Sequence, residues 1–244
     1  ESGEYIQAET LFQRGNRRGH VTVLVTAKDK LRSLLSEGAT VTVSAENPPG
    51  WVIDGVGSPP DIYSLEVNAW VVDAANFIMT RFPADFVYVT TTDYAMHMYA
   101  PDEKQSSRHL SILEDSIGRL VNAHPMASLL LTADHGMGDK RYMVDLKDVL
   151  ERYGIRSVNL VPIIKDRYVV HHSNLGGCMY IYVHPEDVGD AQKILEDTRG
   201  VEHAFLKGEA VAEFLLHPDR VGDLVVTADE DVVFGDPIDV PPIQ

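Results

Sequence analysis

The chain has 244 residues, of which 44% are hydrophobic and 24% are charged, and its 37 acidic and 21 basic side chains give a formal net charge of −16. That length suits one large α/β domain or a core with a smaller addition, and the negative balance disfavours nucleic acid as a partner because phosphates would be repelled. No apolar run approaches the ~20 residues of a membrane span, and the single cysteine, Cys178, excludes an intrachain disulfide and favours a reducing compartment, taken here as the cytoplasm.

Strands and helices alternate along the first 153 residues. Runs rich in β-branched residues predict strands over residues 21–26, 40–44 and 86–91, and the run SLLLT predicts another strand over residues 128–132. The third of these is apolar enough to predict a central, parallel strand. Helices are predicted over residues 28–36, from an N-cap at Asp61 to about Phe82, and over residues 106–122.

Two further patterns refine this part of the chain. Prolines and glycines predict a loop over residues 46–60. In the helix over 106–122, apolar residues recur at spacings of three and four, which predicts one buried stripe. The stripe consists of Leu110, Leu113, Ile117, Leu120 and Val121.

The remaining residues predict a smaller region with a different pattern. A helix over 145–153 ends at Gly154, a residue suited to a helix C-terminus. Strands are predicted near 158–164, 179–183, 202–205 and 224–227, with a helix over 185–197. We therefore predict an α/β fold, with a largely parallel sheet covered by helices on both faces over 1–153. A smaller α+β region over 154–244 would pack on this core or be inserted into it.

Two strand ends carry an aspartate and a histidine together. Asp93 and His97 follow the strand over 86–91, and Asp134 and His135 follow the strand over 128–132. Either pair alone has an ordinary explanation, such as a helix cap. Together, at the carboxyl ends of parallel strands, they favour a shared metal site. Carboxylate and imidazole suit Zn²⁺ and are acceptable to Mn²⁺ or Fe²⁺, and two ions about 3.5–4 Å apart would explain two pairs.

The same residues lie in motifs of a known family. The run Thr132-Ala133-Asp134-His135-Gly136-Met137 resembles the T-x-DHGM signature of the alkaline phosphatase superfamily, in its nucleotide pyrophosphatase/phosphodiesterase branch. Within that branch, VTAKDKLR at 25–32, YVTTTDY at 88–94 with His97, and HHSNLGG at 171–177 resemble the phosphonoacetate hydrolases.

This resemblance implies a two-zinc hydrolase that cleaves the carbon–phosphorus bond of phosphonoacetate to give acetate and phosphate. Asp93 and His97 match two ligands of one zinc, and Asp134 and His135 match two ligands of the other. Lys28 and Lys30 match the lysines that hold the anionic groups of the substrate. A cation is electrostatically disfavoured in the first turn of a helix, so a nearby anion explains this lysine pair better than the helix does.

Other family features have no match in the chain. The chain has no counterpart of three family residues: the aspartate of the first strand, the threonine nucleophile that follows it and the last histidine. We therefore expect an internal piece of a longer enzyme that is inactive by itself. His171 and His172 are predicted to lie near the site. Six other histidines fall in polar or loop surroundings and are predicted to be solvated: His20, His109, His124, His184, His203 and His217.

Two alternatives stay open at this point. One is a metal-dependent phosphodiesterase or phosphomutase of the same superfamily, against which the lysine pair argues. The other is a metal-binding remnant without catalytic activity, which the missing nucleophile favours. The expected partner is a small anionic phosphonate, with no nucleic acid and no membrane, and a homodimer is left open.

Overall fold

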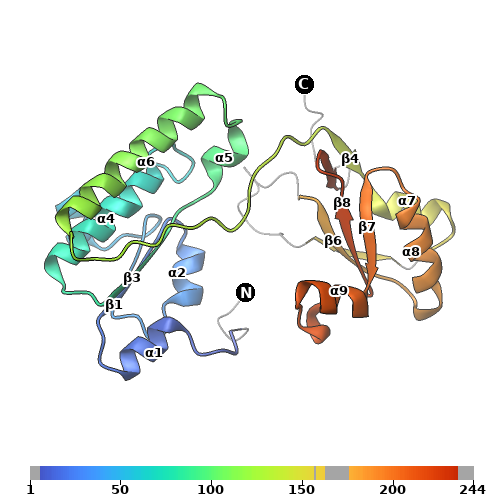
Figure 1. Ribbon diagram of the computed structural model, residues 1–244, viewed down its shortest axis with the longest axis horizontal. Helices are drawn as coiled ribbons and strands as arrows, with labels where there is room; N and C mark the ends of the chain where they lie inside the picture. The colour runs from blue at the N-terminus through green and yellow to red at the C-terminus, as the bar shows by residue number, and fades with distance from the viewer. Residues whose placement is uncertain (1–5, 157, 163–175, 236–244) are drawn as a thin grey trace. The chain divides into compact units, whose positions relative to one another are not determined.

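The computed structural model describes residues 6–156, 158–162 and 176–235 (Figure 1). The chain divides into two compact units, Glu1–His135 and Gly136–Gln244. The predicted domains over 1–153 and 154–244 stay a prediction. Among the described residues, no helix combines the length and apolar character that crossing a bilayer requires.

Three parallel strands form the sheet of the first unit, in the order β2-β1-β3. They are β1 (Thr22–Thr26), β2 (Val41–Ser44) and β3 (Phe86–Thr90). All three were predicted, and every residue of β1 is buried, as expected for a central strand. The prediction that β3 is central is wrong for the described strands, because β3 pairs only with β1 there and its side chains stay partly exposed.

Helices cover both faces of this sheet, as predicted. On one face α4 (Val67–Arg81) packs Val71 and Ile78 against Val23 and Val25 of β1. On the other, Phe12 of α1 (Leu11–Arg17) lies with its ring centroid 5.7 Å from that of Phe86. The alternation of side chains along each strand divides the apolar residues between these two layers.

One loop prediction and one helix-start prediction before α4 are wrong. The predicted loop over 46–60 contains α3 (Gly50–Val56), which begins after Pro49 and ends at Gly57, where φ is 94°. Proline is tolerated at a helix start and glycine favours a helix end, so these residues bound a helix that buries Val52. Asp61 does not cap α4; its Oδ1 accepts a hydrogen bond from the Tyr63 amide in a turn, and α4 begins six residues later.

The helix predicted over 106–122 is α6 (Lys104–Ala123), and Figure 1 shows it alongside α4. The predicted buried stripe is wrong at its two ends, because Leu110 is 57% exposed and Val121 is 42% exposed, and its other three residues, Leu113, Ile117 and Leu120, are only partly buried. The residues of α6 that are buried are His109 and Ser116. The helix therefore turns a polar pair toward the interior, where hydrogen bonds satisfy it.

The strand predicted over 128–132 is also wrong, because these residues have no regular secondary structure. Leu130 is 88% exposed and Leu131 is 73% exposed. A strand needs a partner for its backbone N–H and C=O groups, and no described strand pairs with this segment. A short apolar run alone does not form a strand.

The second unit contains an antiparallel sheet in the order β5-β6-β8-β7. Its strands are β5 (Asn159–Pro162), β6 (Cys178–Tyr182), β7 (Val201–Leu206) and β8 (Leu224–Ala228), with a separate parallel pair of β4 (Tyr142–Val144) and β9 (Val232–Phe234). The helices are α7 (Leu146–Arg152), α8 (Val188–Glu196) and α9 (Lys207–Phe214), with two short 3-10 helices, Pro185–Asp187 and Pro218–Arg220. The predicted strands and helices of this region are present, whereas α9, β4 and β9 were not predicted.

Two side chains cover the outer edge of β7. Gln192 Nε2 donates to the carbonyl oxygen of Ala204 at 2.9 Å, and the Leu206 amide donates to Glu209 Oε2 at 2.8 Å. Both backbone groups therefore have side-chain partners rather than strand partners.

Candidate functional site

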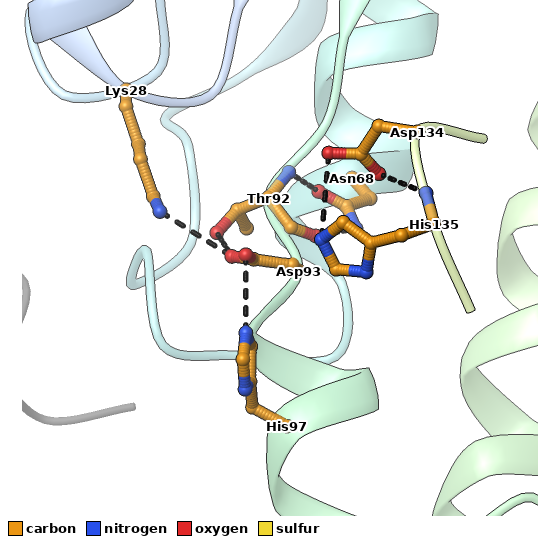
Figure 2. Close-up of polar contacts among 7 residues, drawn as sticks. All are labelled: Lys28, Asn68, Thr92, Asp93, His97, Asp134 and His135. Atoms are coloured by element: carbon orange, nitrogen blue, oxygen red, sulfur yellow. Dashed lines mark hydrogen bonds and ion pairs between the residues drawn. The ribbon is translucent and has the colours of Figure 1, made fainter. Parts of the chain in front are cut away.

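The end of β3 presents an aspartate and a histidine on a short helix. Thr91 and Thr92 lead from β3 to Asp93, which is the N-cap residue of α5 (Tyr94–Met98). His97 lies one helical turn further on, and its Nε2 is 3.2 Å from Asp93 Oδ2. Figure 2 shows the two side chains pointing toward each other. The sequence did not predict α5, which is the element that brings this pair together.

Lys28 reaches the same carboxylate from the neighbouring strand. Thr26 of β1 pairs in register with Thr90 of β3, so the segments that follow the two strands leave the sheet at one edge. Lys28 stands at the N-cap position of α2 (Asp29–Leu35), and its Nζ is 3.3 Å from Asp93 Oδ1 (Figure 2). Its side chain is only 11% exposed, so the ammonium is screened from bulk water.

These neighbours hold Asp93 in its charged form. Partial burial by itself would raise the pKa of Asp93, but the hydrogen bond with His97 and the positive charge of Lys28 outweigh it. The pKa of this carboxyl therefore lies well below its ordinary value. A carboxylate kept charged beside an imidazole has the chemistry of a metal-ligand pair.

The other residues near Lys28 are partly structural. Asp29 Oδ1 accepts hydrogen bonds from Ser44 Oγ and Arg32 Nε, both at 2.6 Å, and so ties α2 to the end of β2. Lys30 lies in the first turn of α2 and is partly buried.

A buried amide supports the residue before Asp93. Asn68 Nδ2 donates to the Thr92 carbonyl oxygen at 2.7 Å, and the Thr92 amide donates to Asn68 Oδ1 at 2.8 Å (Figure 2). His109 lies behind Asn68 and is 2% exposed, so its prediction as a solvated histidine is wrong. No pattern in the sequence pointed to Asn68, and His109 could have been suspected only from its place on the face of α6 that meets α4.

Asp134 and His135 form a second, exposed pair. Asp134 Oδ2 is 3.6 Å from His135 Nε2, and their side chains are 89% and 56% exposed. Asp93 therefore contacts His97, and Asp134 contacts His135. Among the described residues, no group of three His, Cys, Asp or Glu side chains lies close enough together to hold a metal. The shared two-metal site therefore stays a prediction. His171 and His172 lie outside the described residues.

Donor chemistry in each pair fits a zinc ion. Asp93 with His97 and Asp134 with His135 each offer one carboxylate and one imidazole, the ligand types that zinc takes from proteins. The 3.2 Å separation of Asp93 Oδ2 and His97 Nε2 lets both atoms contact one ion, since zinc–oxygen and zinc–nitrogen bonds are about 2.0–2.2 Å.

Comparison with known proteins gives one family and one group of close structures. The family model for type I phosphodiesterase / nucleotide pyrophosphatase matches residues 66–241. A crystal structure of phosphonoacetate hydrolase from Sinorhizobium meliloti in complex with phosphonoacetate superposes with a TM-score of 0.86 at 29% identity, over 96% of this chain and 62% of that one. The complex with phosphonoformate gives a TM-score of 0.89 at 28% identity, over 100% of this chain and 65% of that one.

A more distant structure shares the fold alone. Murine ectonucleotide pyrophosphatase / phosphodiesterase 5 superposes with a TM-score of 0.56 at 17% identity, over 92% of this chain and 55% of that one. The predicted α/β fold with an alkaline-phosphatase-like core agrees with these matches. The chain spans less than two thirds of the length of each of these structures.

Proposed function

The chain belongs to the type I phosphodiesterase / nucleotide pyrophosphatase family, and from this premise we propose that it is part of a hydrolase that cleaves the carbon–phosphorus bond of phosphonoacetate to acetate and phosphate. One observation carries the proposal. Two phosphonoacetate hydrolase structures, bound to phosphonoacetate and to phosphonoformate, match 96% and 100% of the chain with TM-scores of 0.86 and 0.89. Both ligands are small phosphonates that carry a carboxylate.

The charged residues have complementary roles in this proposal. Asp93 and His97 would hold one zinc ion, and Asp134 and His135 the other, with Mn²⁺ or Fe²⁺ as acceptable replacements. Such ions polarise phosphorus–oxygen bonds when they are bound. Lys28 and Lys30 would bind the anionic groups of the substrate. The short distance from Lys28 Nζ to Asp93 Oδ1 supports this, because it puts an ammonium beside the carboxylate expected to bind metal.

The nucleophile is assigned to another part of the enzyme. The chain spans 62% and 65% of the two hydrolase structures, and no threonine in it matches the nucleophile that the family resemblance implies. We place that threonine in the part of the relatives that the chain does not span. The cytoplasm remains the proposed compartment, because a chain with a single cysteine suits a reducing environment.

Phosphate release from phosphonoacetate tests the proposal directly. The complete protein that contains this chain, loaded with Zn²⁺, is expected to release phosphate from phosphonoacetate but much less from methylphosphonate, which lacks the carboxylate. Loss of activity with a chelator and recovery with added Zn²⁺ would support the metal assignment. Equal rates on the two phosphonates would contradict a role for the lysines in carboxylate binding.

A phosphodiesterase is the second candidate, because the matching family model is named for that activity. The same protein should then hydrolyse bis(p-nitrophenyl) phosphate faster than it releases phosphate from phosphonoacetate. The two lysines make this outcome less expected, since they suit a dianion with a carboxylate nearby.

A further inference from the structure

We infer that Asn68 is a positioning residue for Asp93, and that it acts by fixing the backbone of Thr92. The role of Asp93 as a metal ligand is part of the proposed function. The expected effect of Asn68 on metal binding rests on that role, whereas its effect on the Thr92 backbone does not. The clamp, meaning the two hydrogen bonds between the Asn68 side chain and the Thr92 backbone, is a property of the fold.

Asn68 makes two hydrogen bonds to one backbone residue. It lies in the first turn of α4, is 1% exposed, accepts from the Thr92 amide at 2.8 Å and donates to the Thr92 carbonyl oxygen at 2.7 Å. Because β3 ends at Thr90, Thr92 lies beyond the strand pairing, and the Asn68 amide provides the donor and the acceptor that a neighbouring strand would otherwise supply. The clamp therefore fixes the backbone where the chain leaves the sheet.

His109 fixes the orientation of this amide. Its Nδ1 is 2.8 Å from the carbonyl oxygen of Leu65, which can only accept, so Nδ1 carries the proton. In the neutral tautomer that carries this proton, Nε2 is an acceptor, and it lies 3.5 Å from Asn68 Nδ2. The NH₂ group of Asn68 is thus directed at the Thr92 carbonyl oxygen and the ring, which leaves Oδ1 for the Thr92 amide.

The clamp acts on Asp93 because Thr92 is the preceding residue. Thr92 Oγ1 also lies 3.4 Å from Asp93 Oδ1, so the two residues are joined through a side chain as well as through the peptide. Figure 2 shows the amide of Asn68 on one side of this segment and the carboxylate of Asp93 directed toward Lys28 and His97. Freeing Thr92 would let the carboxylate drift from both partners. Partners behind a metal ligand commonly change metal affinity about 10–100-fold when removed.

The same pair of helices offers a matched control. Asn76 Oδ1 lies 3.0 Å from His124 Nε2, so Asn76 of α4 also contacts a histidine beyond α4, at the C-cap of α6, away from Thr92. Asn68→Leu and Asn76→Leu each remove an asparagine–histidine contact between these helices. Only the first removes the clamp.

Amide hydrogen exchange and Zn²⁺ calorimetry on the 244-residue chain test the inference. Asn68→Leu is expected to speed exchange over residues 92–98 at least tenfold relative to Asn76→Leu, with β1 unchanged, and to weaken Zn²⁺ binding about 10–100-fold. In an Asp93→Asn background, Asn68→Leu should cause no further loss of Zn²⁺ affinity, because its effect passes through Asp93. If Asn68→Leu does not fold, Asn68→Ala, which removes both hydrogen bonds to Thr92 and adds no charge, should give the same changes.

The outcomes separate the inference from the proposed function. Equal exchange over 92–98 in the Asn68 and Asn76 variants would overturn the clamp. Additive losses of Zn²⁺ affinity in the double variant would overturn action through Asp93. If the unmodified chain binds no Zn²⁺, the metal assignment fails, and the exchange rates still decide the role of Asn68.

Discussion

At the scale of single residues, the charged state of Asp93 gives unit 1 a pH-dependent stability. The pKa of Asp93 is depressed in the folded state, while in an unfolded chain it is about 3.9. The unfolded chain therefore takes up the proton first as the pH falls. The stabilising contribution is complete above about pH 4 and is lost as the pH falls further, toward the folded pKa.

Replacing Asp93 by asparagine should remove this dependence. The difference in free energy of unfolding between the unmodified chain and Asp93→Asn is expected to be constant from pH 7 to about pH 5 and to shrink below about pH 4. Tryptophan fluorescence during urea unfolding measures it, because Trp51 and Trp70 both belong to the first unit. A difference that did not shrink below about pH 4 would mean that Lys28 and His97 do not lower the folded-state pKa of Asp93.

Lys28 and Lys30 are expected to affect substrate binding rather than folding. In the complete enzyme, Lys28→Ala or Lys30→Ala should weaken transition-state stabilisation for phosphonoacetate by roughly 1.5–3 kcal/mol, as for a lost charged hydrogen bond. Inhibition by inorganic phosphate should change less for whichever lysine holds the carboxylate. Lys104→Ala, at the exposed start of α6, is the matched control. Unchanged kcat/KM in both variants would assign the pair to surface charge.

At the scale of elements, the first unit contains one apolar segment that is buried and another that is exposed to solvent. Ile78 of α4 is fully buried, and Leu130 is 88% exposed. Ile78→Ala should lower the free energy of unfolding by about 2–5 kcal/mol, whereas Leu130→Ser should change it by less than about 0.5 kcal/mol. Urea unfolding followed by tryptophan fluorescence compares the two. A cost of several kcal/mol for Leu130→Ser would show that residues 128–132 are packed in solution.

Helices and strands were predicted correctly where the residues that determine them are close together in the sequence. β1, β2 and α7 were predicted because β-branched runs and a helix-ending glycine at 154 act within a few residues, and the structure adds a cap from Asp145 at the start of α7. Residues 128–132 failed because a strand also needs a neighbour, which a single run of leucines does not reveal. The stripe on α6 failed at its ends because periodicity identifies an apolar face but not whether another element covers it.

In the candidate site, too, some residues could be predicted from local motifs and others could not. The motifs found Asp93, His97 and Lys28, and the register of β1 with β3 explains why Lys28 approaches Asp93. Asn68 could not have been found, because one asparagine in an apolar helix has no pattern of its own. Its importance depends on Thr92, which is 24 residues away in the sequence.

At the scale of the whole molecule, the chain is expected to bind ligands without turning them over. Phosphonates need a strong nucleophile as well as an activated phosphorus, and no residue here matches the family's threonine. Phosphate release from phosphonoacetate by the 244-residue chain with Zn²⁺ should equal that of a control without protein. Robust release by a chain of verified mass would show that a threonine within it, such as one of the run 90–92, is the nucleophile.

The covered edge of β7 bears on how the protein behaves at high concentration. An open strand edge recruits strands from other molecules and is a common start of fibrils. Gln192 and Glu209 occupy the Ala204 carbonyl and the Leu206 amide, so an incoming chain would have to displace two formed hydrogen bonds before making its own. Aggregation is therefore expected to begin at the exposed leucines 129–131 more readily than at β7, and polar substitutions there should raise solubility more than any change on β7.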